Sequence, residues 1–93
     1  MFSWDIRKAQ VNYEKHGVAF EEAATVFADP DGLDWVDLEH SKEERRHKPL
    51  GRSVAGRILL IVYTARKTPH GKEAIRIISA RQASRKEHKA YAG

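Results

Sequence analysis

The chain contains no cysteine, and this absence excludes three kinds of chemistry. It rules out a disulfide framework, a thiolate nucleophile and any zinc site with cysteine ligands. No apolar run approaches the roughly 20 residues that span a membrane. Asp5, Arg7 and Lys8 also interrupt the segment that would be apolar in a signal peptide. We therefore expect a soluble, cytoplasmic protein without a membrane partner.

Acidic residues are scarce in the second half of the chain. Residues 1–44 hold 4 Lys/Arg against 11 Asp/Glu, a formal charge of −7, whereas residues 45–93 hold 13 against 2, a charge of +11. The net charge of +4 therefore hides a strongly divided molecule. A cationic surface raises encounter rates with polyanions and supplies sequence-independent affinity for nucleic acid. Surface charges that only solubilise the protein would give the same count, so both interpretations stay open.

The first third of the chain predicts a strand and two helices within one domain that covers residues 1–93. Residues 2–4 suit a short strand. A helix is predicted over residues 6–15, because Asp5 is a favourable N-cap and Gly17 a favourable stop. A second helix follows, and the apolar side chains of its buried face recur at helical spacing: Phe20, Ala23, Ala24 and Phe27.

Beyond a turn at residues 29–32, the pattern changes to that of strands. Residues 33–37 alternate along a strand. We expect both Trp4 and Trp35 in the core, with stacking on a nucleic-acid base as their alternative role. A capping box at residues 41–44 is not followed by an apolar helical run, so it predicts one short turn at most.

The second half of the chain predicts a sheet and a final helix. Residues 45–51 suit an edge strand, because Pro49 lacks the N–H that a central strand needs. The unbroken apolar run 58–63 indicates a central strand covered on both faces, and residues 74–81 return antiparallel to it. A capping box opens a short basic helix over residues 84–91. The order predicts an α+β fold with a mostly antiparallel sheet of about four strands, helices on one face and the other face free for function.

Metal and nucleophile chemistry finds little support in the sequence. The five histidines are scattered without HExxH spacing, and residues 51–53 lack the flanking positions of a phosphate-binding P-loop. Ser79 has no nucleophile-elbow context. We therefore expect neither a metal nor a cofactor. Positively charged side chains remain as the groups that could stabilise the negative charge of a reacting phosphate.

Arginine suits that task, because it is permanently charged and grips phosphate oxygens with two parallel N–H groups. Arg66 ends the central strand, and two more arginines lie on the next strand. Strict alternation would place Arg76 and Arg81 on opposite faces unless a bulge intervenes. A solvated surface role stays open for each of the three.

Two other side chains have alternative roles. His16 ends the first helix, where an imidazolium interacts favourably with the helix dipole; the alternative role is that of a general acid or base. Tyr91 on the final helix is expected to dock against the sheet; its alternative roles are to stack on a nucleic-acid base or to donate a proton.

An ordered set of short motifs runs from Phe2 to Tyr91. These are Phe2-x-Trp4-Asp5, Lys8, Asn12, Lys15-His16-Gly17-Val18-x-Phe20-Glu21-Glu22-Ala23, Val26-Phe27-x-Asp29-Pro30, Gly51-Arg52-Ser53, Gly56-Arg57, Tyr63-Thr64-x-Arg66 and Ile75-Arg76-Ile77-Ile78-Ser79-Ala80-Arg81. Together they resemble the BrnT family of type II toxins. The resemblance implies a RelE-like fold and a ribonuclease that arrests translation through metal-free attack of the RNA 2′-hydroxyl. It also implies a BrnA-like antitoxin with a ribbon-helix-helix region, through which the complex binds operator DNA and represses its own operon.

The resemblance also assigns site residues. The family's arginines fall on Arg66 and Arg81, and His16 matches a recurrent position; we predict these three as catalytic. We further predict contacts to RNA or its phosphates from Arg76, Lys8, Arg57, Arg85 and Tyr91. Two hypotheses compete with a ribonuclease: a nucleic-acid-binding module without catalysis, and a basic domain that binds an acidic protein.

Overall fold

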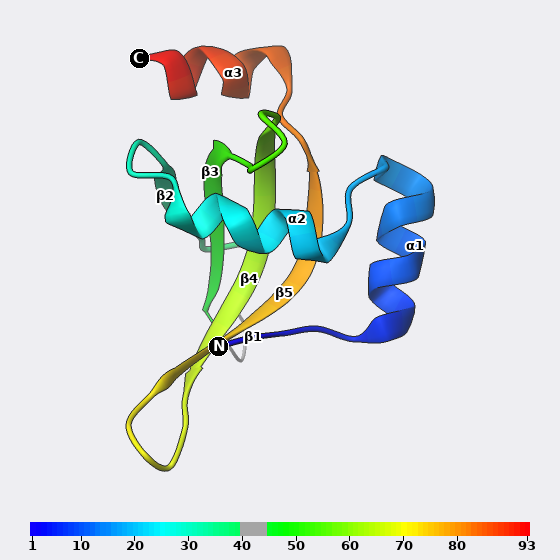
Figure 1. Cartoon of the computed structure of the whole chain (residues 1–93). Helices are drawn as coiled ribbons and strands as arrows, with labels where there is room; N and C mark the ends of the chain where they lie inside the picture. Colours follow the sequence, from blue (N-terminus) through cyan, green and yellow to red (C-terminus); the bar gives the residue numbers. More distant parts are fainter. Residues whose placement is uncertain (40–44) are drawn as a thin grey trace.

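The computed structural model describes residues 1–39 and 45–93, so the predicted turn at residues 41–44 lies outside the described residues. Five strands form one mixed sheet in the order β1-β5-β4-β3-β2 (Figure 1). Their bounds are β1 (Phe2–Ser3), β2 (Leu33–Asp37), β3 (Arg46–Arg52), β4 (Ile58–Lys67) and β5 (Glu73–Gln82). All neighbours are antiparallel except β1 and β5. The sheet is mostly antiparallel, as predicted, but it has five strands rather than about four, because the short N-terminal strand joins it parallel to β5.

The helices begin and end where local signals predict. They are α1 (Ile6–His16), α2 (Phe20–Thr25) with its 3-10 continuation η1 (Val26–Ala28), and α3 (Arg85–Ala92). Asp5 caps α1, because its Oδ1 accepts the N–H groups of Arg7 at 2.9 Å and Lys8 at 3.1 Å. Gly17 ends the helix in the left-handed conformation, with φ of 69°.

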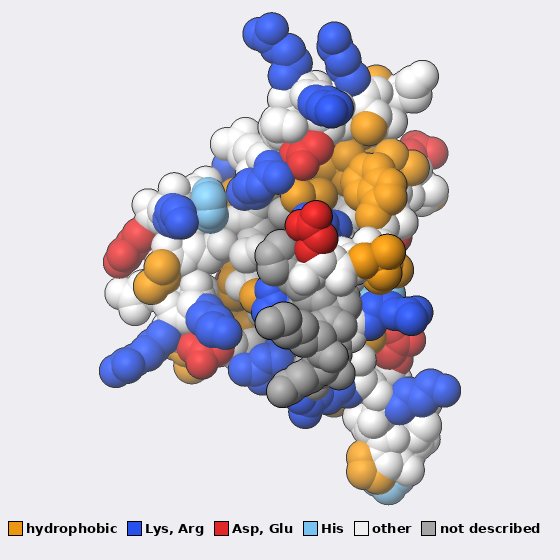
Figure 2. All heavy atoms as spheres, turned by 180° about the vertical axis from the view of Figure 1, so that it is seen from behind, with side chains coloured by type: hydrophobic (Ala, Val, Ile, Leu, Met, Phe, Trp, Pro, Cys, Tyr) orange, Lys and Arg blue, Asp and Glu red, His pale blue; other side chains and the backbone are white. Residues whose placement is uncertain are grey.

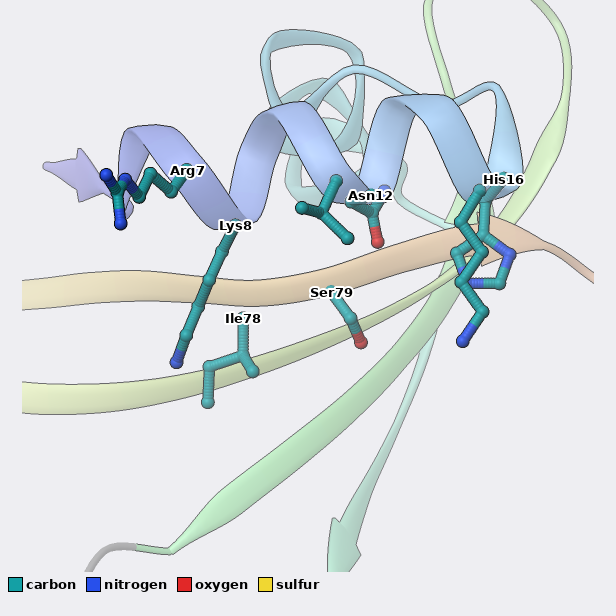
Figure 3. Close-up of a pocket in the computed structure, with 8 residues that line it drawn as sticks. Arg7, Lys8, Asn12, His16, Ile78 and Ser79 are labelled. Atoms are coloured by element: carbon teal, nitrogen blue, oxygen red, sulfur yellow. The ribbon is translucent and has the colours of Figure 1, made fainter.

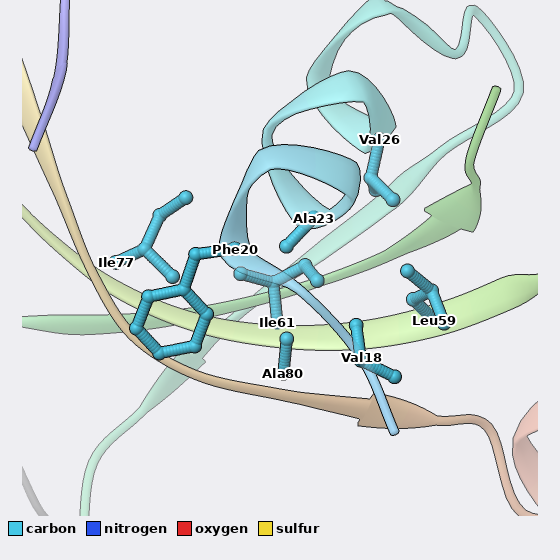
Figure 4. Close-up of a cluster of buried hydrophobic side chains, with 8 residues drawn as sticks. All are labelled: Val18, Phe20, Ala23, Val26, Leu59, Ile61, Ile77 and Ala80. Atoms are coloured by element: carbon cyan, nitrogen blue, oxygen red, sulfur yellow. The ribbon is translucent and has the colours of Figure 1, made fainter. Parts of the chain in front are cut away.

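The core lies on one side of the sheet, where α2 and η1 cross the strands, and we call this side the helix-covered face (Figure 1). Figure 4 shows its buried side chains, which come from α2, η1, the α1–α2 connection, β4 and β5: Val18, Phe20, Ala23, Val26, Leu59, Ile61, Ile77 and Ala80. Trp4 packs edge-on to Phe20 with ring centroids 5.9 Å apart, as expected of a core residue. Helix α1 lies beside β5 and buries only Asn12.

The opposite side of the sheet, which we call the open face, is covered at one end by α3. A second apolar cluster of Leu50, Ile58 and Leu60 lies there, with Tyr91 of α3 packed against it. The expectation that helices lie against one face only was therefore wrong. The apolar run in β4 needs cover on both faces, and α3 supplies it at this end.

Two further expectations about the strands were wrong. β3 is not an edge strand, because it lies between β4 and β2. Among the described residues, Lys48 and Pro49 take no place in the register with β4, so the missing N–H of Pro49 is accommodated inside the sheet. β2 forms the true edge, and this position leaves Trp35 43% exposed rather than in the core.

Candidate functional site

A β-bulge interrupts β5 at its centre. Val62 of β4 pairs with Ser79 of β5. The next residue of β4, Tyr63, pairs with Ile77. Ile78 is therefore an extra residue on β5, and the alternation of side chains shifts by one position there.

This bulge places two arginines on the same side of the sheet. Ile77 and Ala80 are each only 1% exposed, and both belong to the core of the helix-covered face. A regular strand would put residues three positions apart on opposite faces, so only the bulge allows this arrangement. Arg76 and Arg81 adjoin Ile77 and Ala80, and both therefore belong to the open face.

Arg66 joins them, but at a distance. It lies on the open face by alternation from Leu60, the β4 residue opposite Arg81. The six positions from Leu60 to Arg66 correspond to about 20 Å along the strand, at about 3.3 Å per residue. Arg76 lies between them, opposite Thr64. We call Arg66, Arg76 and Arg81 the arginine row; it is an extended line, too long for one phosphate to contact both ends.

A hollow of about 510 Å³ lies beside one end of the arginine row. Arg81, Lys48 and Trp35 are among the side chains that line it. The Nζ of Lys48 lies 3.5 Å from a carboxylate oxygen of Asp37. Figure 2 shows this side of the molecule, with many Lys and Arg side chains on its surface. A half-exposed indole beside cations is an arrangement that can stack on an RNA base while the cations meet its phosphates.

Arg81 is held by a carboxylate of α3. Its Nη1 and Nη2 donate to the two oxygens of Glu87 at 2.8 and 2.9 Å, and Nη1 also donates to the carbonyl of Gln82. The hydrogen bonds between Arg81 and Glu87 lower the pKa of Glu87 to about 2 and raise the pKa of Arg81. A guanidinium has five N–H groups, so two remain for a ligand. The pair fixes the direction of Arg81 and leaves it able to bind an anion.

A second hollow lies between α1 and β5, and it brings together two of the predicted residues. Lys8 and His16 both line it, together with Ser79 of β5 (Figure 3). Ser79 pairs with Val62, which places it on the open face between the two arginines of β5. His16 and Lys8 therefore approach the same stretch of β5 that carries Arg76 and Arg81.

The comparison with protein families decides what kind of protein this is. A family described as the ribonuclease toxin BrnT of type II toxin–antitoxin systems matches residues 4–87, which is most of the chain. The chain belongs to the BrnT family. A search of curated proteins found no match. As in other toxins of such systems, an RNA substrate and an antitoxin partner follow from this membership.

Two predicted contacts of this BrnT-family chain, Arg57 and Arg85, line neither hollow. Arg57 donates to both carboxylate oxygens of Glu22 and to the carbonyl of Gly17, on the helix-covered side. Its hydrogen bonds lower the pKa of Glu22. Arg85 is exposed at the start of α3. Of the predicted residues, Arg81 lines one hollow of the open face, and Lys8 and His16 line the other.

Tyr91 is docked rather than directed toward the arginine row. Its hydroxyl donates to Asp29 Oδ2 at 2.6 Å, and the guanidinium of Arg52 lies 5.8 Å from the centre of its ring. The hydrogen bond to Asp29 raises the pKa of the Tyr91 phenol. These contacts hold α3 against the end of the open face.

Several residues around the site were not predicted from the sequence. Glu87 was identified only as part of a capping box, a local signal that says nothing of Arg81. Arg7 and Lys15 line the α1–β5 hollow, and their spacing from Lys8 was the available signal. In the described ranges 1–39 and 45–93, no three His, Asp or Glu side chains group as metal ligands, and no helix is long and apolar enough to cross a membrane.

Proposed function

We propose that this BrnT-family protein is a metal-independent endoribonuclease of RelE-like fold, which acts in the cytoplasm, cleaves RNA and arrests translation. A BrnA-like antitoxin with a ribbon-helix-helix region would neutralise it, and the complex would bind operator DNA and repress its own operon. The observation that carries the proposal is the bulge at Ile78, because it directs Arg76 and Arg81 to the same side of one strand.

The reaction begins with loss of the proton from an RNA 2′-hydroxyl. The resulting oxygen attacks the adjacent phosphorus, the bond to the 5′-oxygen breaks, and that oxygen takes up a proton. The products are a 2′,3′-cyclic phosphate and a 5′-hydroxyl. Negative charge builds on the pentacoordinate phosphate, and fixed cations directed at it lower the barrier most.

Arg81 is the best placed of the predicted residues for that charge. Its ion pair with Glu87 fixes the guanidinium before RNA arrives, so little ordering is needed on binding. Arg76 lies further along the same face and would bind the phosphate or its neighbour. His16 borders Ser79 from α1 and serves as the proton-transfer group, since an imidazole has one ring nitrogen that can donate a proton and one that can accept it.

Arg66 takes a different part in this proposal. About 20 Å along the strand separates it from Arg81, given about 3.3 Å per residue, so one phosphate cannot contact both. Arg66 would instead bind a more distant phosphate of the same RNA and set its direction across the open face. The antitoxin would act by covering the arginine row with acidic side chains, which compete directly with RNA phosphates.

The decisive experiment incubates purified toxin, freed of its antitoxin, with end-labelled RNA in the presence of EDTA. We expect cleavage by the wild type and loss of at least about 100-fold in rate for Arg81→Ala, since one charge-stabilising group is typically worth 10²–10³ in rate. Arg66→Ala should weaken binding more than it slows cleavage at saturating RNA. Lys72→Ala, an exposed residue of the β4–β5 turn, removes the same charge and serves as the control.

The result also separates the competing functions. RNA that is bound with steep salt dependence but stays whole would support a binding module without catalysis. RNA that is neither bound nor cut would support a protein-interaction domain. Cleavage that survives Arg81→Ala unchanged would remove this arginine from the mechanism.

A further inference from the structure

The hollow between α1 and β5 contains more basic side chains than the predicted site includes. It encloses about 330 Å³ and is lined by four basic side chains of α1, namely Arg7, Lys8, Lys15 and His16, with Ser79 on the other wall. No Asp or Glu is among its lining residues in the part of the chain that the structure describes. We call it the α1–β5 groove. Its composition suits a polyanion.

Helix geometry explains why three of the four cations face one way. Positions 8, 15 and 16 lie on the same side of α1 as Asn12, each about one turn away from it. Asn12 is buried, and its amide bonds the N–H and C=O of Ala80 and the carbonyl of Val18, at 2.8–3.1 Å. This anchor fixes the basic side of α1 against β5, so the cations are held by a rigid scaffold rather than scattered over the surface.

The helix dipole accounts for only half of these charges. Lys15 and His16 lie in the last turn of α1, where positive charge is favourable. Arg7 and Lys8 lie in the first turn, which contains no acidic residue and where positive charge is unfavourable. A basic pair at this end weakens the helix slightly, which indicates a role other than stabilising α1.

The groove leads to the arginine row. β1 pairs with Ile75 and Arg76, so among the described residues no strand lies beside Ile78 and Ser79 on the side of β5 away from β4, where the groove lies. In Figure 3 the side chain of Lys8 crosses β5 toward the side on which Ile78 and Ser79 point. Ser79 thus belongs to the groove and also lies on the open face between the arginines of β5.

We propose that the α1–β5 groove binds the sugar–phosphate backbone of single-stranded RNA that continues from the open face around the edge of β5. The proposal rests on the proposed function, because it extends the path of the same substrate. The RNA would run along the arginine row, pass Ser79 and meet the basic side of α1. Phosphate contacts of this kind add affinity without reading sequence.

The test uses a single-stranded 2′-O-methyl RNA oligonucleotide, which lacks the attacking hydroxyl and stays intact. Its dissociation constant is measured across a series of salt concentrations for the wild type and for Arg7→Ala/Lys15→Ala. Each lost phosphate contact on a single strand reduces the slope of log affinity against log salt by about 0.7, so we expect a decrease of about 1.4. Both residues are exposed, and circular dichroism and a thermal melt verify that the variant is folded.

The matched control is Lys72→Ala/Lys86→Ala, which also removes two exposed positive charges but none from the groove. We expect it to keep the wild-type slope. Equal slopes for the two double variants would overturn the proposal, because the effect would then be one of net charge. Cleavage of unmodified RNA is assayed in parallel. If the slope decreases only in the groove variant and none of the proteins cleaves RNA, the result would support RNA binding in the groove and overturn the proposed ribonuclease activity.

Discussion

The two faces of the sheet come from alternate residues of the same strands, yet their arginines have different surroundings. On the helix-covered face Arg57 is bound to Glu22 and to the carbonyl of Gly17, and these hydrogen bonds join the β3–β4 turn to α2. On the open face Arg81 is bound in the same way, to a carboxylate and a backbone carbonyl, but it also lines the hollow beside the arginine row. The comparison teaches that the surroundings of an arginine, rather than the number of its hydrogen bonds, separate a structural role from a functional one.

The largest difference between the faces should appear in stability. Phe20 is fully buried in the helix-covered core, so Phe20→Ala should lower the free energy of unfolding by about 3–5 kcal/mol. Urea denaturation followed by circular dichroism measures this loss. Val54→Ala, at a site 83% exposed, is the control and should stay within about 0.5 kcal/mol of the wild type. A Phe20→Ala cost below 1 kcal/mol would mean that this cluster is not the main core.

Substituting one arginine on each face tests the comparison, with an expected effect of intermediate size. Arg57→Ala removes the hydrogen bonds to the carbonyl of Gly17 and to the carboxylate of Glu22, which keeps only that from Ser53, and this loss should cost about 1–3 kcal/mol of stability. Arg76→Ala on the open face should change stability by less than about 0.5 kcal/mol and weaken RNA binding instead. Urea denaturation and a binding titration on both variants measure the two effects. Equal stabilities, or equal RNA affinities, would contradict the division of roles.

The smallest expected effect concerns the pH dependence of the Arg81–Glu87 pair. The pKa of Glu87 is about 2 in the folded protein, below its ordinary value of 4.5, so the carboxylate stabilises the fold above pH 4.5. That contribution is lost as pH falls from 4.5 toward 2. Because the Arg81 side chain is 40% exposed, solvent screening keeps it below about 1 kcal/mol.

The measurement compares urea denaturation at pH 5 and pH 3 for the wild type and for Glu87→Gln. The wild type should lose more stability between the two pH values than the variant does, because only the wild type carries the titrating carboxylate. If the two proteins lose the same amount, Glu87 does not have the lowered pKa.

Local signals predicted the helices of this fold well, and non-local pairing explains what they missed. Asp5 and Gly17 mark the two ends of α1 through their own conformations, so the neighbouring residues in the sequence suffice to identify these ends. The position of β3 depends on which strand pairs beyond it, and Pro49 suggested an edge that β2 in fact occupies. Trp35 became half-exposed for the same reason, since it lies on that edge strand.

The candidate site was predicted in part. Alternation identified the conflict between Arg76 and Arg81 and named a bulge as one way to resolve it, but no residue type marks Ile78 as the bulged position. The pairing of Arg81 with Glu87 depends on how α3 folds back over the sheet. The separation of Arg66 from Arg81 follows from strand register, which no single stretch of sequence contains.

The bulge also governs how this site should be recognised in related chains. Residues 76 and 81 are five positions apart, and on a regular strand an odd step of this kind would place their side chains on opposite sides of the sheet. A relative with a step of four and an unbroken strand would present its two arginines as this chain does, and an alignment would show only a one-residue gap. A relative with the same step of five but no bulge would align without a gap and yet have a divided site. Counting paired residues, rather than all residues, is therefore the criterion for equivalence along this strand.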